Sequence, residues 1–282
     1  MFKLYNGVEI PKIGLGATMV PFGEAGNKIY ERDYEFYKYA IEMGGILFDT
    51  SAAYWRNDEA LGQAVLDTGK RNEVKIMTKV SNKQQRRENV RKEIEAHLRY
   101  LKTDYVDYYL IHWPQTGTFI NTYKELERVY EEGLAKSIGV CNCNIHHLKE
   151  LAACTNIKPM INQFEITPFF TQDALVNYCK AFDIMPVAYS VLGEMHDCLH
   201  KAEPLRKIAE KYNKTTAQII LKWNEQLGRP ALTQTRNKEH YIESFIANTG
   251  YSLTDKEICW INSMNDNIRL RYNPDTADFL KL

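Results

Sequence analysis

The chain has 282 residues, of which 44% are hydrophobic and 26% are charged, a globular composition that excludes a disordered or fibrous protein. Lys and Arg number 36 and Asp and Glu also number 36, so the zero net charge offers no attraction for nucleic acid or an anionic membrane. The N-terminus lacks the apolar core of a signal peptide and no apolar run approaches the roughly 20 residues of a membrane span, so we expect a cytoplasmic protein without nucleic-acid or membrane partners.

The N-terminal segment predicts a β-hairpin, because Asn6-Gly7 lies near apolar residues and Asn-Gly favours the tight turns of hairpins. Beyond it, short apolar runs alternate with longer segments of helical period. The predicted strands cover residues 12–16, 46–50, 74–80, 105–113, 135–141, 160–165, 185–190 and 230–235. The predicted helices cover residues 32–43, 58–66, 88–101, 123–130, 145–153, 172–181, 204–212, 217–226, 238–248 and 254–263.

This alternation predicts eight parallel strands joined by right-handed crossovers. Strands such as Ile46-Leu47-Phe48 are apolar at consecutive positions, which is typical of strands covered on both faces. No linker or low-complexity segment divides the chain. We therefore expect one (β/α)8 TIM barrel domain over residues 1–282, with an N-terminal β-hairpin and a short C-terminal extension. A doubly wound sheet is the alternative, although Gly14-Leu15-Gly16 lacks the third glycine of the dinucleotide-binding motif.

Six cysteines raise the question of disulfides or a metal site. They occupy positions 141, 143, 154, 179, 198 and 259, with no C-x-x-C pair. Cys141 and Cys143 lie close in sequence to His146 and His147, and thiolate and imidazole are both zinc ligands. Because this spacing matches no structural zinc motif and no second ligand pair follows, we expect reduced thiols and no metal.

Ionisable residues lie at or just beyond the ends of three consecutive predicted strands. Asp49 ends the second strand, Tyr54 follows five residues later, Lys79 is near the end of the third and His112 near the end of the fourth. In a βα barrel, catalytic groups come from the C-terminal ends of different strands. Taken alone, each residue is better explained as a paired polar residue of the core or as a solvent-exposed residue at a strand end. The presence of four such residues at the ends of three neighbouring strands favours a catalytic site.

These four side chains suit proton transfer to a carbonyl oxygen. A phenol such as Tyr54 is a weak acid at neutral pH, and a nearby ammonium favours the phenolate and lowers its pKa. Lys79 supplies that charge, Asp49 keeps Lys79 protonated, and His112 is suited to bind the substrate oxygen. With no nucleophilic Ser or Cys in a suitable motif, we expect acid–base chemistry around a hydride transfer from a cofactor.

Six motifs, in this order along the chain, resemble the signatures of the aldo-keto reductases. They are Phe48-Asp49-Thr50 with Tyr54, Thr78-Lys79-Val80, Ile111-His112-Trp113-Pro114, Gly139-Val140-Cys141-Asn142, Asn162-Gln163-Phe164-Glu165 and Ala188-Tyr189-Ser190-Val191-Leu192-Gly193. The resemblance implies a (β/α)8 barrel that binds NAD(P)H across its C-terminal face. It also implies reduction of an aldehyde or ketone, such as a small polar carbonyl compound or sugar derivative, to an alcohol. The family's catalytic tetrad is matched by Asp49, Tyr54, Lys79 and His112, with Tyr54 as the general acid.

The same resemblance assigns residues to the nicotinamide half of the cofactor. Asn142 and Gln163 match the amides that hold the nicotinamide carboxamide, and Tyr189 matches the aromatic residue stacked on the ring. Cys141 lies where the family usually has Ser, and because a thiol is the weaker hydrogen-bonding group, we expect one weakened carboxamide contact. The loop that passes the pyrophosphate is matched by Ser190, Leu192 and Gly193.

The adenosine end departs from the family pattern. Gln234 and His240 replace the Lys and Arg that usually hold the 2′-phosphate, and charge-assisted contacts are roughly twice as strong as neutral ones. Unless Arg236 or Lys238 compensates from a shifted position, we expect a weakened preference for NADPH, with NADH tolerated or preferred. The remaining cofactor positions at this end are Thr235, Glu243 and Ser244.

The substrate pocket is expected to involve Thr18, Trp55 and Trp113, and the resemblance implies that residues 267–282 shape it. Two other functions stay open. One is a Schiff-base barrel aldolase using Lys79, which the adjacent Asp49 disfavours because an anion raises a lysine pKa. The other is a non-catalytic NAD(P)H-binding regulatory subunit, which the intact tetrad disfavours. We expect a monomer or a weak homo-oligomer.

Overall fold

Eight parallel strands form a closed barrel at the centre of the computed structural model, which describes residues 1–54, 56–86 and 89–279. The strand order around the barrel is β10-β3-β4-β5-β6-β7-β8-β9. Its strands are β3 (Ile13–Gly16), β4 (Leu47–Asp49), β5 (Lys75–Val80), β6 (Val106–Ile111), β7 (Ala135–Cys141), β8 (Ile161–Glu165), β9 (Met185–Tyr189) and β10 (Ala231–Thr233). The predicted (β/α)8 barrel is confirmed, and its closure excludes the doubly wound alternative.

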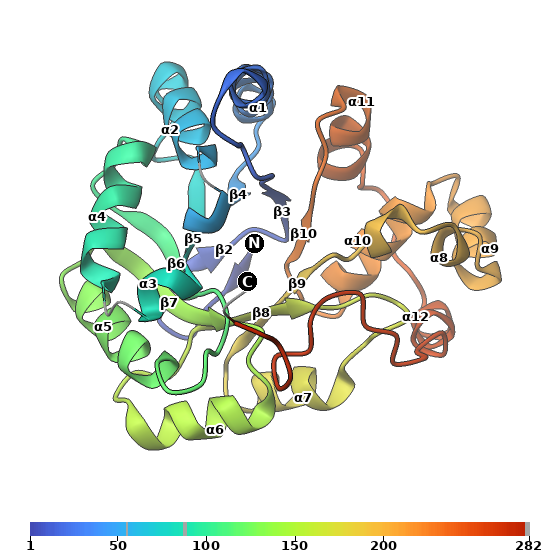
Figure 1. Cartoon of the computed structure of the whole chain (residues 1–282). Helices are drawn as coiled ribbons and strands as arrows, with labels where there is room; N and C mark the ends of the chain where they lie inside the picture. The colour runs from blue at the N-terminus through green and yellow to red at the C-terminus, as the bar shows by residue number, and fades with distance from the viewer. Residues whose placement is uncertain (55, 87–88, 280–282) are drawn as a thin grey trace.

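Helices surround the barrel in Figure 1 and bury the outer faces of the strands. They are α1 (Glu24–Glu42), α2 (Asn57–Thr68), α3 (Asn82–Arg86), α4 (Val90–Leu101), α5 (Phe119–Glu131), α6 (Ile145–Cys154), α7 (Asp173–Ala181), α8 (Asp197–His200), α9 (Glu203–Tyr212), α10 (Thr216–Gln226), α11 (Lys238–Tyr241) and α12 (Asp255–Asn262). Among the described residues, no helix is long and apolar enough to cross a lipid bilayer.

Three helical predictions differ from the structure. Helix α1 begins eight residues before the predicted start, because its polar first turns carry no apolar period, and Gly26 there packs directly against the carbonyl of Pro21. The short polar helices α3 and α8 were not predicted. The predicted helix over 238–248 is divided, since α11 is followed by a π-helical turn over Ile242–Ile246.

The predicted N-terminal hairpin is confirmed: β1 (Phe2–Lys3) pairs antiparallel with β2 (Glu9–Ile10). Gly7 in the turn has a φ of 90°, which only glycine adopts readily. The side chain of Asn6 donates to the carbonyl of Lys136 at 3.0 Å, and the Tyr108 hydroxyl donates to the carbonyl of Glu9. Because these partners lie near the starts of β7 and β6, the hairpin covers the N-terminal end of the barrel.

The C-terminal tail, residues 265–279, crosses the opposite end of the barrel and is drawn in red in Figure 1. The carboxylate of Glu165, the last residue of β8, is fully buried and accepts the backbone N–H groups of Leu270 and Arg271 at 2.8 and 2.9 Å. Further along, the rings of Tyr272 and Phe279 lie 6.3 and 6.4 Å from that of Trp113. The tail is therefore fixed to the C-terminal ends of the strands.

Candidate active site

Four predicted catalytic residues converge at the C-terminal ends of β4, β5 and β6. Asp49 is the last residue of β4, and Tyr54 ends the short 3-10 turn that follows it. Lys79 is the penultimate residue of β5, and His112 directly follows β6. The Tyr54 ring lies edge-on to the His112 ring at 6.1 Å, and the Nζ of Lys79 is 5.9 Å from the Tyr54 ring centre. The parallel register places all four side chains together.

Lys79 is buried but fully partnered. Its Nζ lies 2.6 Å from Oδ1 of Asp49 and donates to the backbone carbonyl of Thr50 at 2.8 Å. Burial lowers the pKa of Lys79, but the Asp49 carboxylate, followed by Tyr54, raises it above its ordinary value. The amine is therefore charged, which is the opposite of what a Schiff-base lysine requires.

Burial has the largest effect on the pKa of the Tyr54 phenol. It raises the pKa of the phenol, while the neighbouring Lys79 ammonium lowers it, and the net pKa lies above its ordinary value. The predicted direction of the Lys79 contribution is confirmed, but the predicted net lowering is wrong because the desolvation of the phenolate is the larger effect. At neutral pH the phenol consequently keeps the proton that a general acid must donate.

His112 is a neutral imidazole at physiological pH. Burial, with a smaller contribution from the Lys79 ammonium, lowers the pKa of His112 to about 3. Its Nδ1 lies 3.3 Å from the hydroxyl of Ser51, which is able to donate to it. In that tautomer Nε2 carries the proton and is a neutral hydrogen-bond donor.

The residues matched to the nicotinamide are linked to the catalytic groups by hydrogen bonds. The Asn142 amide donates to the carbonyl of His112 at 3.0 Å, and the Tyr189 hydroxyl donates to Oδ1 of Asn142 at 2.6 Å. Gln163 Nε2 donates to Oδ1 of Asp49 at 3.1 Å. These contacts orient both amides and the Tyr189 ring beside the catalytic residues.

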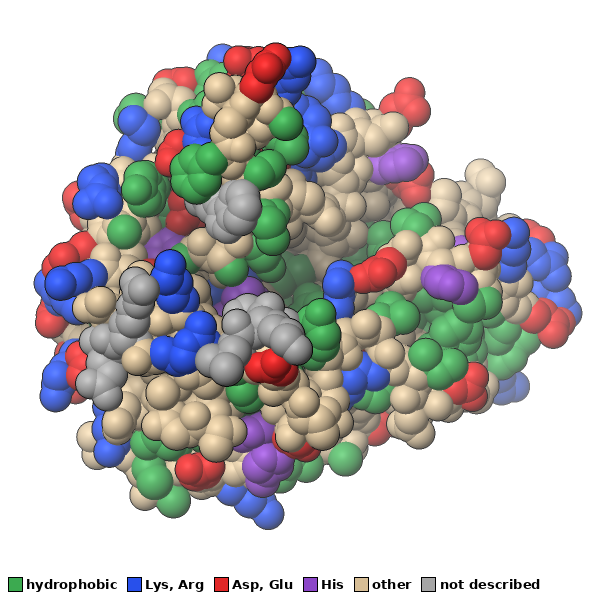
Figure 2. Space-filling view, viewed as in Figure 1, with side chains coloured by type: hydrophobic (Ala, Val, Ile, Leu, Met, Phe, Trp, Pro, Cys, Tyr) green, Lys and Arg blue, Asp and Glu red, His purple; other side chains and the backbone are tan. Residues whose placement is uncertain are grey.

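A cavity of about 1110 Å³ opens at this end of the barrel, and Figure 2 shows the hollow from the side viewed in Figure 1. It exceeds the volume of about 300–1,000 Å³ that is usual for drug-sized ligands. The predicted residues on its wall are Thr18, Asp49, Tyr54, His112, Trp113, Asn142, Gln163, Tyr189, Ser190, Leu192, Gln234, Thr235, His240, Glu243 and Ser244. The cavity thus joins the predicted catalytic residues to the predicted adenosine end.

Three predicted residues are placed off the cavity wall. Lys79 lies behind the wall, against Asp49, and Gly193 lies in the loop with its Cα against Leu199. Cys141 is fully buried, and its thiol donates to Oε1 of Gln163 at 3.6 Å, which places it behind that amide. Trp55 lies outside the described residues.

Sequence reasoning assigned no site role to several wall residues that come from loops and short turns, from the start of α10 and from the tail. They are Met19, Glu194, Met195, Thr215, Thr216, Ala217, Arg271 and Tyr272. Thr215, Thr216 and Ala217 cap and begin α10, where the helical period marks the element but not its position on the cavity wall. For the tail, the cluster of Arg and Tyr near the C-terminus was the available signal.

Neither candidate for compensation at the adenosine end faces the cavity. Arg236 is half-buried and binds the carboxylate of Asp33 through Nε and Nη2 at 2.9 and 3.1 Å, while Nη2 also donates to the Tyr37 hydroxyl. The Nζ of Lys238 lies 4.5 Å from the ring centre of Tyr39. Arg236 is thus neutralised by a structural ion pair.

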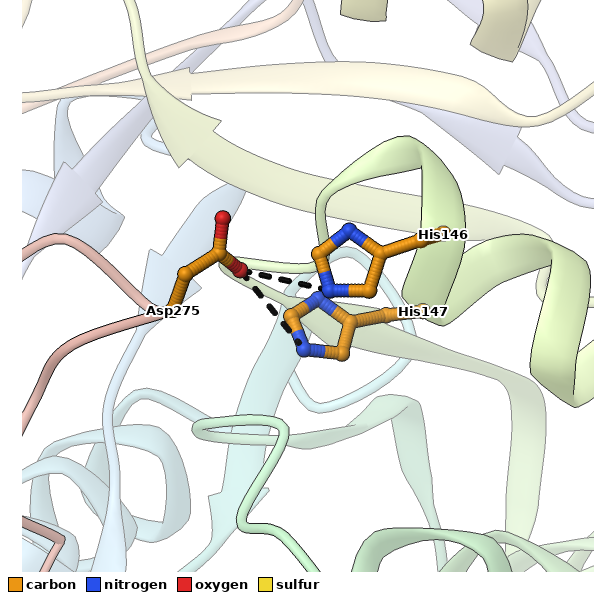
Figure 3. A group of neighbouring side chains, drawn as sticks. All are labelled: His146, His147 and Asp275. Atoms are coloured by element: carbon orange, nitrogen blue, oxygen red, sulfur yellow. Dashed lines mark ion pairs between the residues drawn. The ribbon is translucent and has the colours of Figure 1, made fainter.

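The two histidines near Cys141 pack against the tail (Figure 3). Their Nε2 atoms lie 3.3 Å (His146) and 3.9 Å (His147) from Oδ1 of Asp275, whose other oxygen accepts from the Asn144 side chain at 2.8 Å. Nδ1 of His147 accepts the backbone N–H of Asn144, so its Nε2 carries the proton and has no lone pair for a metal. Burial also raises the pKa of the Cys141 thiol, disfavouring a thiolate ligand. We therefore interpret the histidine–aspartate group as an anchor for the tail.

A closed parallel barrel that brings a phenol, an ammonium, a carboxylate and a neutral imidazole to one large cavity defines a barrel oxidoreductase. The sequence profile of the Aldo/keto reductase family matches residues 12–266, and the chain belongs to this family. It is an NAD(P)H-dependent oxidoreductase that reduces carbonyl groups.

Curated relatives cover nearly the whole chain. The chain is 39% identical to the glyoxal reductase of Bacillus subtilis (strain 168), over 98% of this chain and 97% of the relative. It is 33% identical to the methylglyoxal reductase DkgA of Yersinia pestis, over 98% and 96%. Among solved structures, an aldo-keto reductase enzyme from a Medee basin deep-sea metagenome library has a TM-score of 0.91 at 32% identity, covering 99% of this chain and 100% of that one.

Proposed function

We propose that this enzyme reduces small polar carbonyl compounds, and in particular 1,2-dicarbonyl compounds such as glyoxal and methylglyoxal, with Tyr54 as the general acid. The observation that carries this proposal is the position of the protonated Tyr54 and the neutral His112 on one cavity wall, with the Lys79–Asp49 ion pair directly behind them. The names of the two relatives support the substrate class.

The proposed chemistry divides among the four side chains. The bound cofactor supplies a hydride to the carbonyl carbon. Tyr54 donates its proton to the carbonyl oxygen, which becomes the alcohol hydroxyl, and His112 holds that oxygen by a hydrogen bond from Nε2. The Lys79 ammonium stabilises the phenolate left on Tyr54 until solvent restores the proton, and Asp49 keeps Lys79 charged and aimed.

The wall fits a nicotinamide dinucleotide. Asn142 and Gln163 are amides already oriented by hydrogen bonds, which suits them to a carboxamide group, and the Tyr189 ring is held in place by its hydroxyl. Cys141 would act through Gln163 rather than by touching the carboxamide. Gln234, Thr235, His240, Glu243 and Ser244 would receive the adenosine.

We propose that the enzyme accepts NADH as well as NADPH. Gln234 is neutral, and the guanidinium of Arg236 is occupied by Asp33, so the wall offers no strong cation for a 2′-phosphate at the positions the family uses. NADH, which lacks the 2′-phosphate, therefore loses little binding free energy at the adenosine end of the site.

We propose a cytoplasmic monomer or weak homo-oligomer. All six cysteines are unpaired and three of them are exposed, which supports a reducing compartment. Size-exclusion chromatography with light scattering tests the oligomeric state.

Replacing Tyr54 by Phe tests the catalytic proposal. We expect Tyr54→Phe to lower kcat for methylglyoxal by a factor of about 10²–10⁴, because it removes the proton donor. The Kd for NADH and NADPH, measured by fluorescence titration, should stay nearly unchanged. An active Tyr54→Phe enzyme, or one that no longer binds cofactor, would assign Tyr54 a different role.

A further inference from the structure

The loop that follows β9 has an unusual backbone. Ser190, Glu194 and Met195 have φ values of 51°, 55° and 59°, in the left-handed region that non-glycine residues rarely adopt. Such conformations cost free energy and persist only where surrounding contacts hold them. Residues 190–196 follow Tyr189, and Ser190, Val191, Leu192, Glu194 and Met195 among them lie on the cavity wall, so contacts from elsewhere must hold this backbone.

Arg271 of the C-terminal tail supplies those contacts. Its Nη2 lies 2.6 Å from Oε1 of Glu194, and its Nε donates to the Ser190 hydroxyl at 3.1 Å. One guanidinium thus joins two points of the loop. Its own backbone is fixed, because its N–H donates to the buried Glu165 carboxylate.

Arg271 also supplies a charge that the cavity otherwise lacks. Among the described wall residues, the acids are Asp49, Glu194 and Glu243, and the Lys79 ammonium lies behind Asp49. Arg271 is the permanent cation on that wall. The diphosphate of a dinucleotide is an anion, and a guanidinium binds phosphate oxygens with two parallel hydrogen bonds.

We propose that Arg271 is a cofactor-binding residue whose guanidinium binds the diphosphate of the dinucleotide, while its ion pair with Glu194 holds residues 190–196 closed over it. This inference rests on the proposed cofactor site. The Ser190 hydroxyl, which Arg271 touches, belongs to the segment expected to pass the pyrophosphate. A diphosphate bound there replaces or shares the hydrogen bond from Arg271 Nε to the Ser190 hydroxyl, while the ion pair with Glu194 stays in place.

The test compares Arg271→Gln with Arg269→Gln. Arg269 is two residues away on the same tail, and its guanidinium lies 4.5 Å from the ring centre of Phe170, so its replacement makes the same charge change away from the cavity wall. We expect Arg271→Gln to raise the Kd of NADH, NADPH and ADP-ribose by at least about tenfold, with Arg271→Lys intermediate. Adenosine, which has no diphosphate, should bind both variants as it binds the wild type.

Stopped-flow fluorescence tests the ion pair separately. We expect Glu194→Gln to release NADH several-fold faster than the wild type, because the loop loses the stronger of its two attachments to Arg271, the ion pair. An unchanged release rate would remove that part of the proposal. Unchanged Kd values in Arg271→Gln, equal losses in Arg269→Gln, or an equal loss for adenosine would overturn the diphosphate assignment.

The Kd and release-rate measurements need no turnover, so they separate the two proposals. A wild-type protein that binds no dinucleotide would refute the proposed function. Wild-type binding that Arg271→Gln leaves unaltered would refute only the role of Arg271. A rise in the KM of an anionic carbonyl substrate without any change in cofactor Kd would place Arg271 in the substrate site and overturn the inference.

Discussion

Asp58 on α2 and His97 on α4 form a buried ion pair behind the strand that carries Lys79. The other oxygen of Asp58 accepts from the Thr50 hydroxyl at 2.7 Å, and the Thr50 carbonyl accepts from the Lys79 amine. Burial lowers the pKa of His97, but the Asp58 carboxylate, with smaller contributions that include Glu93, raises it above its ordinary value. Two outer helices are thereby connected to the Lys79 ammonium through Thr50.

Asp58→Asn should destabilise the protein, since it leaves a buried imidazolium without its carboxylate. We expect a loss of about 3 kcal/mol in the free energy of unfolding, measured by urea denaturation. Because the folded pKa of His97 is raised, the lost stability is fully present below about pH 6.5 and fades as the pH rises through the folded pKa. Asp67→Asn, an exposed change on the same helix, is the control. A difference between Asp58→Asn and wild type that grows with pH would contradict this assignment.

His112→Gln should also alter how the free energy of unfolding depends on pH, with a sign opposite to that of the His97 contribution. The pKa of His112 is lowered to about 3, so the unfolded chain binds its proton more readily and the wild type loses stability as the pH falls from about 6.5 toward 3. The variant lacks this contribution and should show a shallower decline over that range. Urea denaturation of both proteins between pH 7 and 4 measures it. Parallel curves would indicate that folding leaves the pKa of His112 unchanged.

Gln234→Lys should shift cofactor choice toward NADPH. A new ammonium at the adenosine end adds a charge-assisted contact to the 2′-phosphate, and we expect the ratio of the NADH Kd to the NADPH Kd to rise about tenfold. Gln63→Lys, on helix α2, makes the same chemical change elsewhere. If the Kd values of NADH and NADPH fall by the same factor, the added charge acts on a group other than the 2′-phosphate.

Glu165→Gln should loosen the tail. A glutamine cannot accept both N–H groups through two oxygens, so the amides of Leu270 and Arg271 should exchange with solvent faster. We expect the KM for methylglyoxal to rise several-fold, with a smaller change in kcat. Hydrogen exchange followed by mass spectrometry locates the change, and the exposed Glu203→Gln serves as the control. Protected tail amides in Glu165→Gln would show that other contacts hold the segment.

The barrel was predictable because its strands are short apolar runs separated by helical periods. The range 135–141 is the same in the prediction and in β7, where six of seven residues are buried. The start of α1 was not predictable, since Glu24–Glu31 shows no regular apolar period and contains Gly26, which packs against the backbone of Pro21. Propensity and hydrophobic period do not register a close backbone approach of this kind, although it joins residues only five positions apart.

The candidate site also contains positions that the strand pattern predicts and contacts that it does not predict. The sequence alone predicted that Asp49, Lys79 and His112 lie close together, because parallel strands present their C-terminal ends at one face. The ion pair of Arg236 could not be predicted, because its partner Asp33 is 203 positions away in the sequence, on α1. The contacts of Arg271 likewise depend on a tail with no regular secondary structure, held by a carboxylate on β8.

The two ends of the described chain lie at opposite ends of the barrel, with the hairpin beneath the strands and Phe279 beside Trp113. A bulky group attached near Phe279 would therefore stand close to the cavity that Trp113 lines. A fusion to Met1 would project from the far side. Kinetic work on this enzyme is best done with purification handles at the N-terminus.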